Sequence, residues 1–214
     1  MNSSSLSYQR PAAPLEHEIE IKRSRFIALL AAVENEREAR DFIDRAKTRF
    51  PDARHHCSAY LYHVEDSHPV QRFSDDGEPS GTAGKPILDV LKGSGMTDIC
   101  VVVVRYFGGV KLGAGGLVHA YGGAASQAVD KVRRSTRAVR ELYDVASEHA
   151  AAGRIEAELR GRGYEVVNTE YGEQVTHTFA IQPGGKPELV ELLASLSQGQ
   201  ATPCYTGSRW IDIE

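Results

Sequence analysis

A run of mostly β-branched residues, Ile99–Tyr106, constrains the fold of this chain more than any other feature. The run does not alternate between apolar and polar residues, and strands of this kind are buried on both faces of a sheet. A glycine-rich segment, Phe107–Gly116, follows directly, and a helical pattern then continues to about Arg134. The order strand, glycine loop, helix predicts an α/β domain in which Ile99–Tyr106 is a central strand.

The residues before this run predict the other elements of the same domain. Apolar residues recur along the chain at every second residue in some stretches and at every third or fourth residue in others. We expect strands over Phe26–Val33 and Cys57–Val64, with an alternating stretch at Glu18–Ile21, and helices over Glu34–Phe50 and Pro86–Leu91. Asp66–Gly84 is rich in Ser, Asp, Gly and Pro and lacks periodicity. We expect a long loop there, of the kind that is usually functional or disordered.

The pattern changes near Arg137, and a second domain is expected beyond it. The predicted elements are a strand over Glu141–Ala146, a helix over Glu148–Arg162, strands over Tyr164–Tyr171 and Gln174–Gln182, a helix over Pro187–Leu196 and a strand over Gln200–Ile213. This βαββαβ order is that of a ferredoxin-like sandwich. The fold class is therefore α/β (α+β). We expect a flexible leader over residues 1–15, an N-terminal domain over 16–137 and a small C-terminal domain over 138–214.

The composition indicates a folded protein without a membrane span. Hydrophobic residues make up 41% and charged residues 25% of the chain, which excludes wholesale disorder. The longest apolar stretch, Ile99–Val104, is far shorter than the roughly 20 residues that a membrane helix needs. No secretory signal is expected, because the first residues lack a basic start followed by an apolar block. Three dispersed cysteines without a CxxC pair fit a reducing cytoplasm, which is the predicted location.

The charge of the chain is unevenly distributed. The net charge of −4 excludes a uniformly basic coat for nucleic acid. Acidic and basic residues are nearly balanced up to residue 137, whereas acidic residues are twice as frequent as basic ones beyond it. The acidic C-terminal domain would disfavour non-specific RNA binding and could instead bind a protein partner.

The glycine-rich segment is the strongest local indication of a ligand site. Its glycines allow a ligand to approach the backbone closely, and the following helix offers unpaired N–H groups to an anion. The spacing matches neither the dinucleotide fingerprint nor the Walker sequence, and a tight connection that serves packing alone also explains the glycines. The candidate phosphate-binding residues are Arg105, Gly108, Gly109, Lys111, Gly113, Gly115 and Gly116.

The loop Ser74–Gly84 is a second candidate site. Its carboxylates, Asp75, Asp76 and Glu78, lie close enough in sequence to hold a hard cation, although their spacing is not that of an EF-hand. Its hydroxyl residues would act as nucleophiles only beside a base. A structured loop that is bonded through its own side chains is the simpler interpretation. The candidate functional residues of this loop are Ser74, Asp75, Asp76, Glu78, Ser80, Thr82 and Gly84.

Two other groups of residues are weaker candidates for a site. Tyr106 lies between Arg105 and Phe107 and would stack on a base in an RNA-binding groove, whereas core packing is the simpler interpretation for Phe107 and Tyr60. The sequence His55-His56-Cys57 provides too few ligands on one face of a strand for zinc. We predict no metal site and no cofactor, except Mg²⁺ if the chain is an enzyme.

Several segments together resemble the signature of the Impact/YigZ family. The resemblance covers about residues 16–135, and the rest of the chain is similar in length and element order to the small domain that bacterial members carry. The segments are ARHHC at 53–57, DDGEPSGTAG at 75–84, RYFGG at 105–109 and GGLVHAYG at 115–122, with Ile87-Leu88, Leu91, Met96, Val102-Val103, Leu112 and Gly113 at the matching spacing.

This resemblance implies more about fold than about chemistry. The N-terminal domain is expected to adopt the ribosomal protein S5 domain 2-like fold, and the C-terminal domain to resemble the ferredoxin-like domains of elongation factor G. Eukaryotic members regulate translation, and for bacterial members the family implies a role in translation or RNA binding. His119 stands where the family usually has Arg or Lys, so a phosphate contact there would be weaker or pH-dependent.

Three functions are compatible with the sequence. The first, which we favour, is a cytoplasmic translation-associated regulator or factor that binds RNA or the ribosome in a groove between Ser74–Gly84 and Phe107–Gly116. The second is an enzyme similar to the small-molecule kinases of the same fold, in which Asp75, Asp76 or Glu78 would hold Mg²⁺ or act as a base. Against it, the glycine loop lacks the serines that such kinases use. The third is a protein–protein adaptor whose glycine loop is structural.

Overall fold

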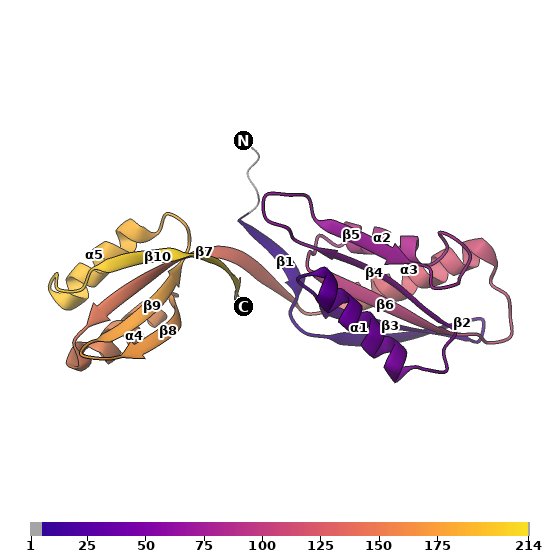
Figure 1. Cartoon of the computed structure of the whole chain (residues 1–214), viewed down its shortest axis with the longest axis horizontal. Coiled ribbons are helices and arrows are strands. Elements are labelled where there is room, and N and C mark those ends of the chain that lie inside the picture. The colour runs from indigo at the N-terminus through magenta and orange to yellow at the C-terminus, as the bar shows by residue number, and fades with distance from the viewer. Residues whose placement is uncertain (1–5, 214) are drawn as a thin grey trace. The chain divides into compact units, whose positions relative to one another are not determined.

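The computed structural model describes residues 6–213 of the chain (Figure 1). These residues form two compact units that divide between Thr136 and Arg137. The first unit contains β1 (Ser7–Pro11), β2 (Leu15–Ile21), β3 (Ser24–Ala32), α1 (Glu36–Arg49), β4 (His55–Tyr62), β5 (Val70–Ser74), α2 (Gly84–Gly93), β6 (Ile99–Tyr106) and α3 (Gly113–Lys131). Strand β7 (Arg134–Ser147) begins at its end.

The sheet of the first unit has the strand order β2-β3-β6-β4-β5, with antiparallel neighbours throughout. Strand β6 is therefore its central strand, and it covers the predicted residues from Ile99 to Tyr106. Helix α1 covers one face of the sheet, and α2 and α3 cover the other (Figure 1). The predicted α/β class is confirmed for this unit.

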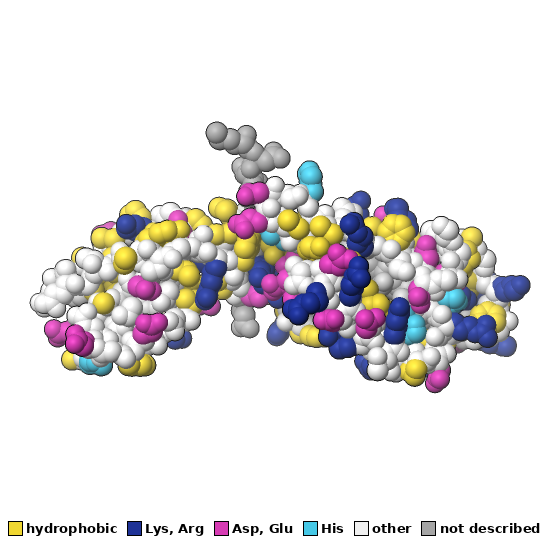
Figure 2. All heavy atoms as spheres, in the orientation of Figure 1, with side chains coloured by type: hydrophobic (Ala, Val, Ile, Leu, Met, Phe, Trp, Pro, Cys, Tyr) yellow, Lys and Arg dark blue, Asp and Glu magenta, His cyan; other side chains and the backbone are white. Residues whose placement is uncertain are grey.

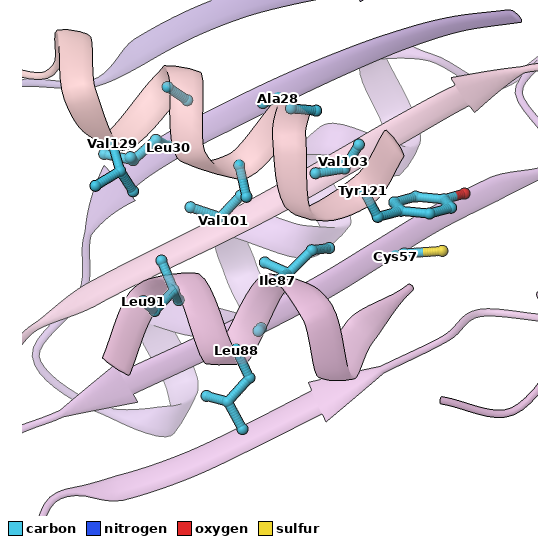
Figure 3. Close-up of a cluster of buried hydrophobic side chains, with 14 of the residues drawn as sticks. Ala28, Leu30, Cys57, Ile87, Leu88, Leu91, Val101, Val103, Tyr121 and Val129 are labelled. Carbon is cyan, nitrogen blue, oxygen red and sulfur yellow. The ribbon is translucent and has the colours of Figure 1, made fainter. Parts of the chain in front are cut away.

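Burial on both faces of β6 explains why the strand shows no alternation. Val101 and Val103 belong to the core beneath α2 and α3, a part of which is drawn in Figure 3. Cys100, Val102 and Val104 belong to the core beneath α1. All five are fully buried, so an apolar residue is required at every position along this stretch.

Two predictions about the N-terminal part are wrong. Val70–Ser74 lies within the predicted loop 66–84 but forms β5, an edge strand paired antiparallel with β4. The predicted flexible leader 1–15 contains β1, which pairs with β7, and Ala12 N–H next to it donates to the Arg133 carbonyl at 2.8 Å. Residues 1–5 of that leader lie outside the described part of the chain.

The second unit has the βαββαβ order that the sequence predicts. It consists of β7, α4 (His149–Gly161), β8 (Glu165–Tyr171), β9 (Val175–Ile181), α5 (Lys186–Ser197) and β10 (Pro203–Ile213). The strands lie in the order β10-β7-β9-β8, which is the order of a ferredoxin-like sandwich. Its core packs α4 and α5 on the sheet through Ile155, Leu159, Phe179, Leu189 and Leu193. None of the helices found in residues 6–213 is long and apolar enough to cross a bilayer.

Candidate functional site

Residues of the two loops singled out from the sequence line one cavity of about 350 Å³ in the first unit. Glu78 and Pro79 come from the loop Ser74–Gly84, and the other lining residues come from the end of β6, the glycine-rich segment, the first turns of α3 and the start of β4. The lining residues are Arg54, His55, Glu78, Pro79, Arg105, Phe107, Lys111, Leu112, Gly113, Ala114 and Leu117. We call this cavity and its rim the groove.

Asp75 holds the loop Ser74–Gly84, which we call the acidic loop, in its folded shape. Its Oδ1 accepts hydrogen bonds from the backbone N–H groups of Ala83 (3.0 Å) and Gly84 (2.8 Å), and its Oδ2 accepts one from Gly81 (2.8 Å). Burial raises the pKa of the Asp75 carboxyl, but these three donors lower it more, so the pKa lies below its ordinary value. The carboxylate thus serves the start of α2, which has no capping side chain of its own.

Asp76 fixes the same loop to β4. Its Oδ2 accepts a hydrogen bond from the His56 backbone N–H at 2.7 Å, and its carbonyl lies 2.8 Å from His55 Nδ1. Asp76 has a φ of 40° and is followed by Gly77 at 84°, so the chain turns sharply here. The simpler interpretation of the loop, a structure bonded through its own side chains, therefore describes Asp75 and Asp76.

Glu78 is a buried carboxylate in the lining of the groove. Its Oε1 accepts hydrogen bonds from Arg105 Nη1 at 2.6 Å and from the Tyr121 hydroxyl at 2.7 Å. The side chains of Glu78 and Arg105 are only 4% and 8% exposed, so this ion pair is largely shielded from water. One carboxylate thereby joins the acidic loop, β6 and α3.

Cys57 lies beside Tyr121 under the acidic loop, and the two side chains point in the same direction (Figure 3). The Cys57 thiol donates to the Asp75 carbonyl at 3.0 Å. Burial raises the pKa of this thiol to about 12, and burial also raises the pKa of Tyr121 far above its ordinary value. Both groups are therefore neutral at physiological pH, and the thiol is not a reactive nucleophile.

Positive charge is available at the rim of the groove. Arg54 and Lys111 are exposed, and neither forms an ion pair with any residue that the structure describes. Arg105, by contrast, is neutralised by Glu78, and its guanidinium carbon lies 5.6 Å from the ring centre of Phe26 and 5.6 Å from that of Phe107. Figure 2 shows Lys and Arg side chains gathered mainly on the first unit, on the face that is drawn.

The glycines of the segment Phe107–Gly116 have different roles. A Cβ atom on Gly108 would lie 2.0 Å from the carbonyl carbon of Arg23, so this glycine allows the chain that leaves β6 to pass close to the turn between β2 and β3. Gly109 and Gly113 have φ values of 84° and 73°, which disfavour other residues. Gly115 and Gly116 lie in the first turn of α3, whose N-terminus has no side-chain cap.

The predicted orientations of two aromatic residues are wrong. Tyr106 does not line the groove: it packs against the core on the α1 side of the sheet, and Arg25 lies 5.4 Å from the centre of its ring. Phe107, for which core packing was expected, is 54% exposed and lines the groove. Tyr60 is buried as expected.

The remaining candidate residues lie outside the cavity. His119 and Ser80 are exposed. Thr82 is buried, and its hydroxyl donates to the Pro79 carbonyl at 2.6 Å. Ser74 Oγ accepts from the Asp76 N–H at 3.2 Å, and a Cβ on Gly84 would lie 2.6 Å from the Ser74 carbonyl oxygen. These contacts give Ser74, Thr82 and Gly84 structural roles.

The carboxylates of the acidic loop do not converge on one point. Asp75 faces the start of α2, Asp76 faces β4, and Glu78 faces Arg105 and Tyr121. Across residues 6–213, no three His, Cys, Asp or Glu side chains gather where they could hold a metal ion. The arrangement provides an apolar cavity with a cationic rim.

Two residues of the groove, Arg54 and His55, are not among the site residues predicted from the sequence. Both belong to the ARHHC segment, which resembles the family signature and which provides too few ligands for zinc. The signal that points to them is their position at the start of β4, beside β6: His55 pairs with Arg105 in the register of these strands.

Comparison with known proteins agrees with this architecture. Residues 22–129 match the Impact N-terminal domain, and residues 145–200 match a domain of unknown function, DUF1949. The IMPACT family member YigZ of Escherichia coli (strain K12) is 40% identical over 193 residues, covering 90% of this chain and 95% of that protein. The IMPACT family member YvyE of Bacillus subtilis (strain 168) is 39% identical, covering 87% of this chain and 85% of that protein.

A solved structure is similar over both units. The crystal structure of a hypothetical protein superposes with a TM-score of 0.63 at 39% identity and covers 94% of this chain and 97% of that chain. The two domain matches and the long alignments to relatives lead to one assignment. The chain belongs to the IMPACT family.

Proposed function

We propose that this protein is a cytoplasmic, translation-associated factor that binds RNA or an RNA surface of the ribosome through the groove. The observation that carries the proposal is the combination, in one cavity, of unpaired cations at the rim and an exposed aromatic ring at the wall. Cations beside an exposed aromatic side chain are the usual means of binding a nucleic acid strand. The resemblance to a family whose eukaryotic members regulate translation supports the same role.

The rim supplies local positive charge although the net charge of the protein is −4. Lys111, in the glycine-rich segment, and Arg54, directly before β4, line the same cavity as Gly113 at the uncapped N-terminus of α3. Each phosphate that such a rim neutralises releases condensed counterions, so binding weakens as the salt concentration rises. With two cations, the slope of log K against log salt should change by about 1.5 when both are removed.

Arg105 is an unsuitable position for testing this proposal. Its guanidinium is the partner of the buried Glu78 carboxylate. Removing it would leave a buried charge without a partner, which destabilises a fold by about 3–5 kcal/mol. A loss of binding in that variant would not distinguish a missing phosphate contact from a damaged loop.

The test is co-sedimentation of the purified protein with ribosomes at low and high salt. The variant Arg54→Ala/Lys111→Ala should lose the salt-sensitive part of the binding. The control Arg37→Ala/Lys92→Ala removes the same charge from exposed positions on α1 and α2 and should bind as the unmodified chain does. Equal binding by the two double variants would refute the groove as the binding site.

Exposed aromatic side chains on the acidic second unit favour a second candidate function, binding of a basic protein. Tyr171 and Tyr205 are 79% and 53% exposed, and tyrosine is enriched at protein interfaces. In this case, Tyr171→Ser in the full chain should reduce ribosome co-sedimentation while leaving binding to a purified RNA unchanged. A Tyr171→Ser chain that still co-sediments fully would exclude Tyr171 from such an interface.

A further inference from the structure

We propose that the cavity of the groove accepts one unstacked nucleotide of a single-stranded RNA, with its base against Phe107 and its phosphate at Lys111. This inference rests on the proposed function and makes it more specific, because it names the form of RNA that is bound. A groove that only tracks phosphates would bind duplex and single strand alike, whereas a cavity for a base requires a base that is free of its partner.

The size and lining of the cavity suit a single base. Its volume of about 350 Å³ is near the lower end of the range for small-molecule sites, so it can enclose one flat group but no helix. Phe107, Leu112, Leu117 and Pro79 supply apolar walls. A wall of this kind favours the face of a base over a hydrated ion.

Phe107 is built as a stacking platform. The residue is 54% exposed although it follows directly on the buried strand β6. The Arg105 guanidinium lies 5.6 Å from the ring centre, which fixes the ring against a side chain that is itself immobilised by Glu78. Stacking of a base on an aromatic ring contributes about 1–3 kcal/mol.

Two charged side chains of the lining are almost fully covered. Arg105 Nε is buried and has no hydrogen-bond partner within residues 6–213. The Glu78 carboxylate accepts two hydrogen bonds through Oε1 alone. Because the Arg105 and Glu78 side chains are only 8% and 4% exposed, the apolar walls and the ring of Phe107, rather than these two groups, would receive the base.

The rim is placed for the phosphate. Lys111 and the first turn of α3 line the same cavity as Phe107. A base that is stacked on Phe107 therefore has its own backbone next to the cation and to the N–H groups at Gly113 and Ala114. Arg54, which lines the same cavity and is exposed, is available to the neighbouring phosphate.

The test compares two RNAs of equal length by fluorescence anisotropy, a labelled single strand without self-pairing and a blunt duplex. The single strand should bind at least tenfold more tightly to the unmodified chain. Phe107→Leu should weaken single-strand binding about tenfold, whereas Phe107→Tyr should retain it. The control Phe73→Leu changes a similarly exposed ring on β5 that does not line the cavity and should have no effect.

A second variant keeps the test decisive. Ala114→Phe fills the cavity from the first turn of α3 without removing a charge, and it should abolish the preference for the single strand. Equal affinities for single strand and duplex, or unchanged binding by both Phe107→Leu and Ala114→Phe, would overturn the nucleotide pocket while leaving salt-dependent RNA binding intact. The absence of any RNA binding by the unmodified chain at low salt would overturn the proposed function as well.

Discussion

Replacing Asp75 by Asn tests whether the acidic loop is held by one carboxylate. In the structure, Oδ1 of Asp75 accepts from Ala83 and Gly84, and Oδ2 accepts from Gly81. An asparagine retains one carbonyl oxygen for the first two donors. Its amide nitrogen then faces the Gly81 N–H, so two donors oppose each other and the charge is gone.

The expected cost follows from the number of bonds. A hydrogen bond to a charged group contributes about 1.5–3 kcal/mol. Asp75→Asn loses one such bond and weakens two others, so we expect a local destabilisation of about 2–4 kcal/mol. In hydrogen exchange, 1.4 kcal/mol corresponds to a tenfold change, so protection of the Gly81, Ala83 and Gly84 amides should fall by about 30-fold or more.

The assay is hydrogen exchange by NMR at neutral pH. Asp52→Asn is the control, because Asp52 is exposed in the turn after α1 and should leave all three amides unchanged. The folded-state pKa of Asp75 is lowered from its ordinary value of 3.8. Its stabilisation is therefore present above pH 4 and is lost as the pH falls through the lower folded value. Unchanged exchange at Gly81, Ala83 and Gly84 in Asp75→Asn would refute the reasoning.

Four further substitutions test the same unit, each by urea unfolding followed by far-UV circular dichroism. Glu78→Gln should destabilise the protein by about 3 kcal/mol, because the buried Arg105 loses its counter-charge; a cost below 0.5 kcal/mol would contradict a shielded pair. Gly108→Ala should cost at least about 2 kcal/mol, since its Cβ would lie 2.0 Å from backbone atoms of Arg23, whereas Gly123→Ala, mid-helix with open space around it, should stabilise by up to about 1 kcal/mol. Because the pKa of Cys57 is raised in the folded state, the contribution of this thiol to the free energy of unfolding is complete below pH 9. This contribution is progressively lost as the pH rises to about 12. The stability of the unmodified chain relative to Cys57→Ala should therefore fall by about 1.4 kcal/mol per pH unit above 9, and parallel pH profiles would show that the thiol does not titrate as described.

Elements with a strong hydrophobic pattern were predictable from the sequence. The limits of β6 agree with Ile99–Tyr106 because burial on both faces demands an apolar residue at every position. Strand β5 was missed because four of its five residues are exposed, so no apolar alternation distinguishes Val70–Ser74 from the loop around it. Strand β1 was missed because its partner, β7, lies more than 100 residues further along the chain, and local patterns carry no information about such pairing.

The candidate site was predictable to the level of its two loops but not of its side chains. The sequence pointed to a groove between them, and the structure has a cavity there. Strand alternation already separates Tyr106 from Arg105, since consecutive residues of β6 face opposite cores. Phe107 lies beyond the end of the strand, where alternation no longer applies, so its exposure could not be predicted from the sequence. The pairing of Glu78 with Tyr121 joins residues 43 apart and had no local signal.

The bonds within the acidic loop have a consequence for binding kinetics. Because Asp75, Asp76 and Glu78 each find their partners within the chain, the wall of the groove has its final shape before any ligand arrives. A preformed site requires no slow ordering step, so the encounter rate is set by diffusion and by the charges of the rim. We expect association to follow a single exponential whose rate rises linearly with ligand concentration and falls with salt. Complexes of different affinity should differ mainly in their dissociation rates.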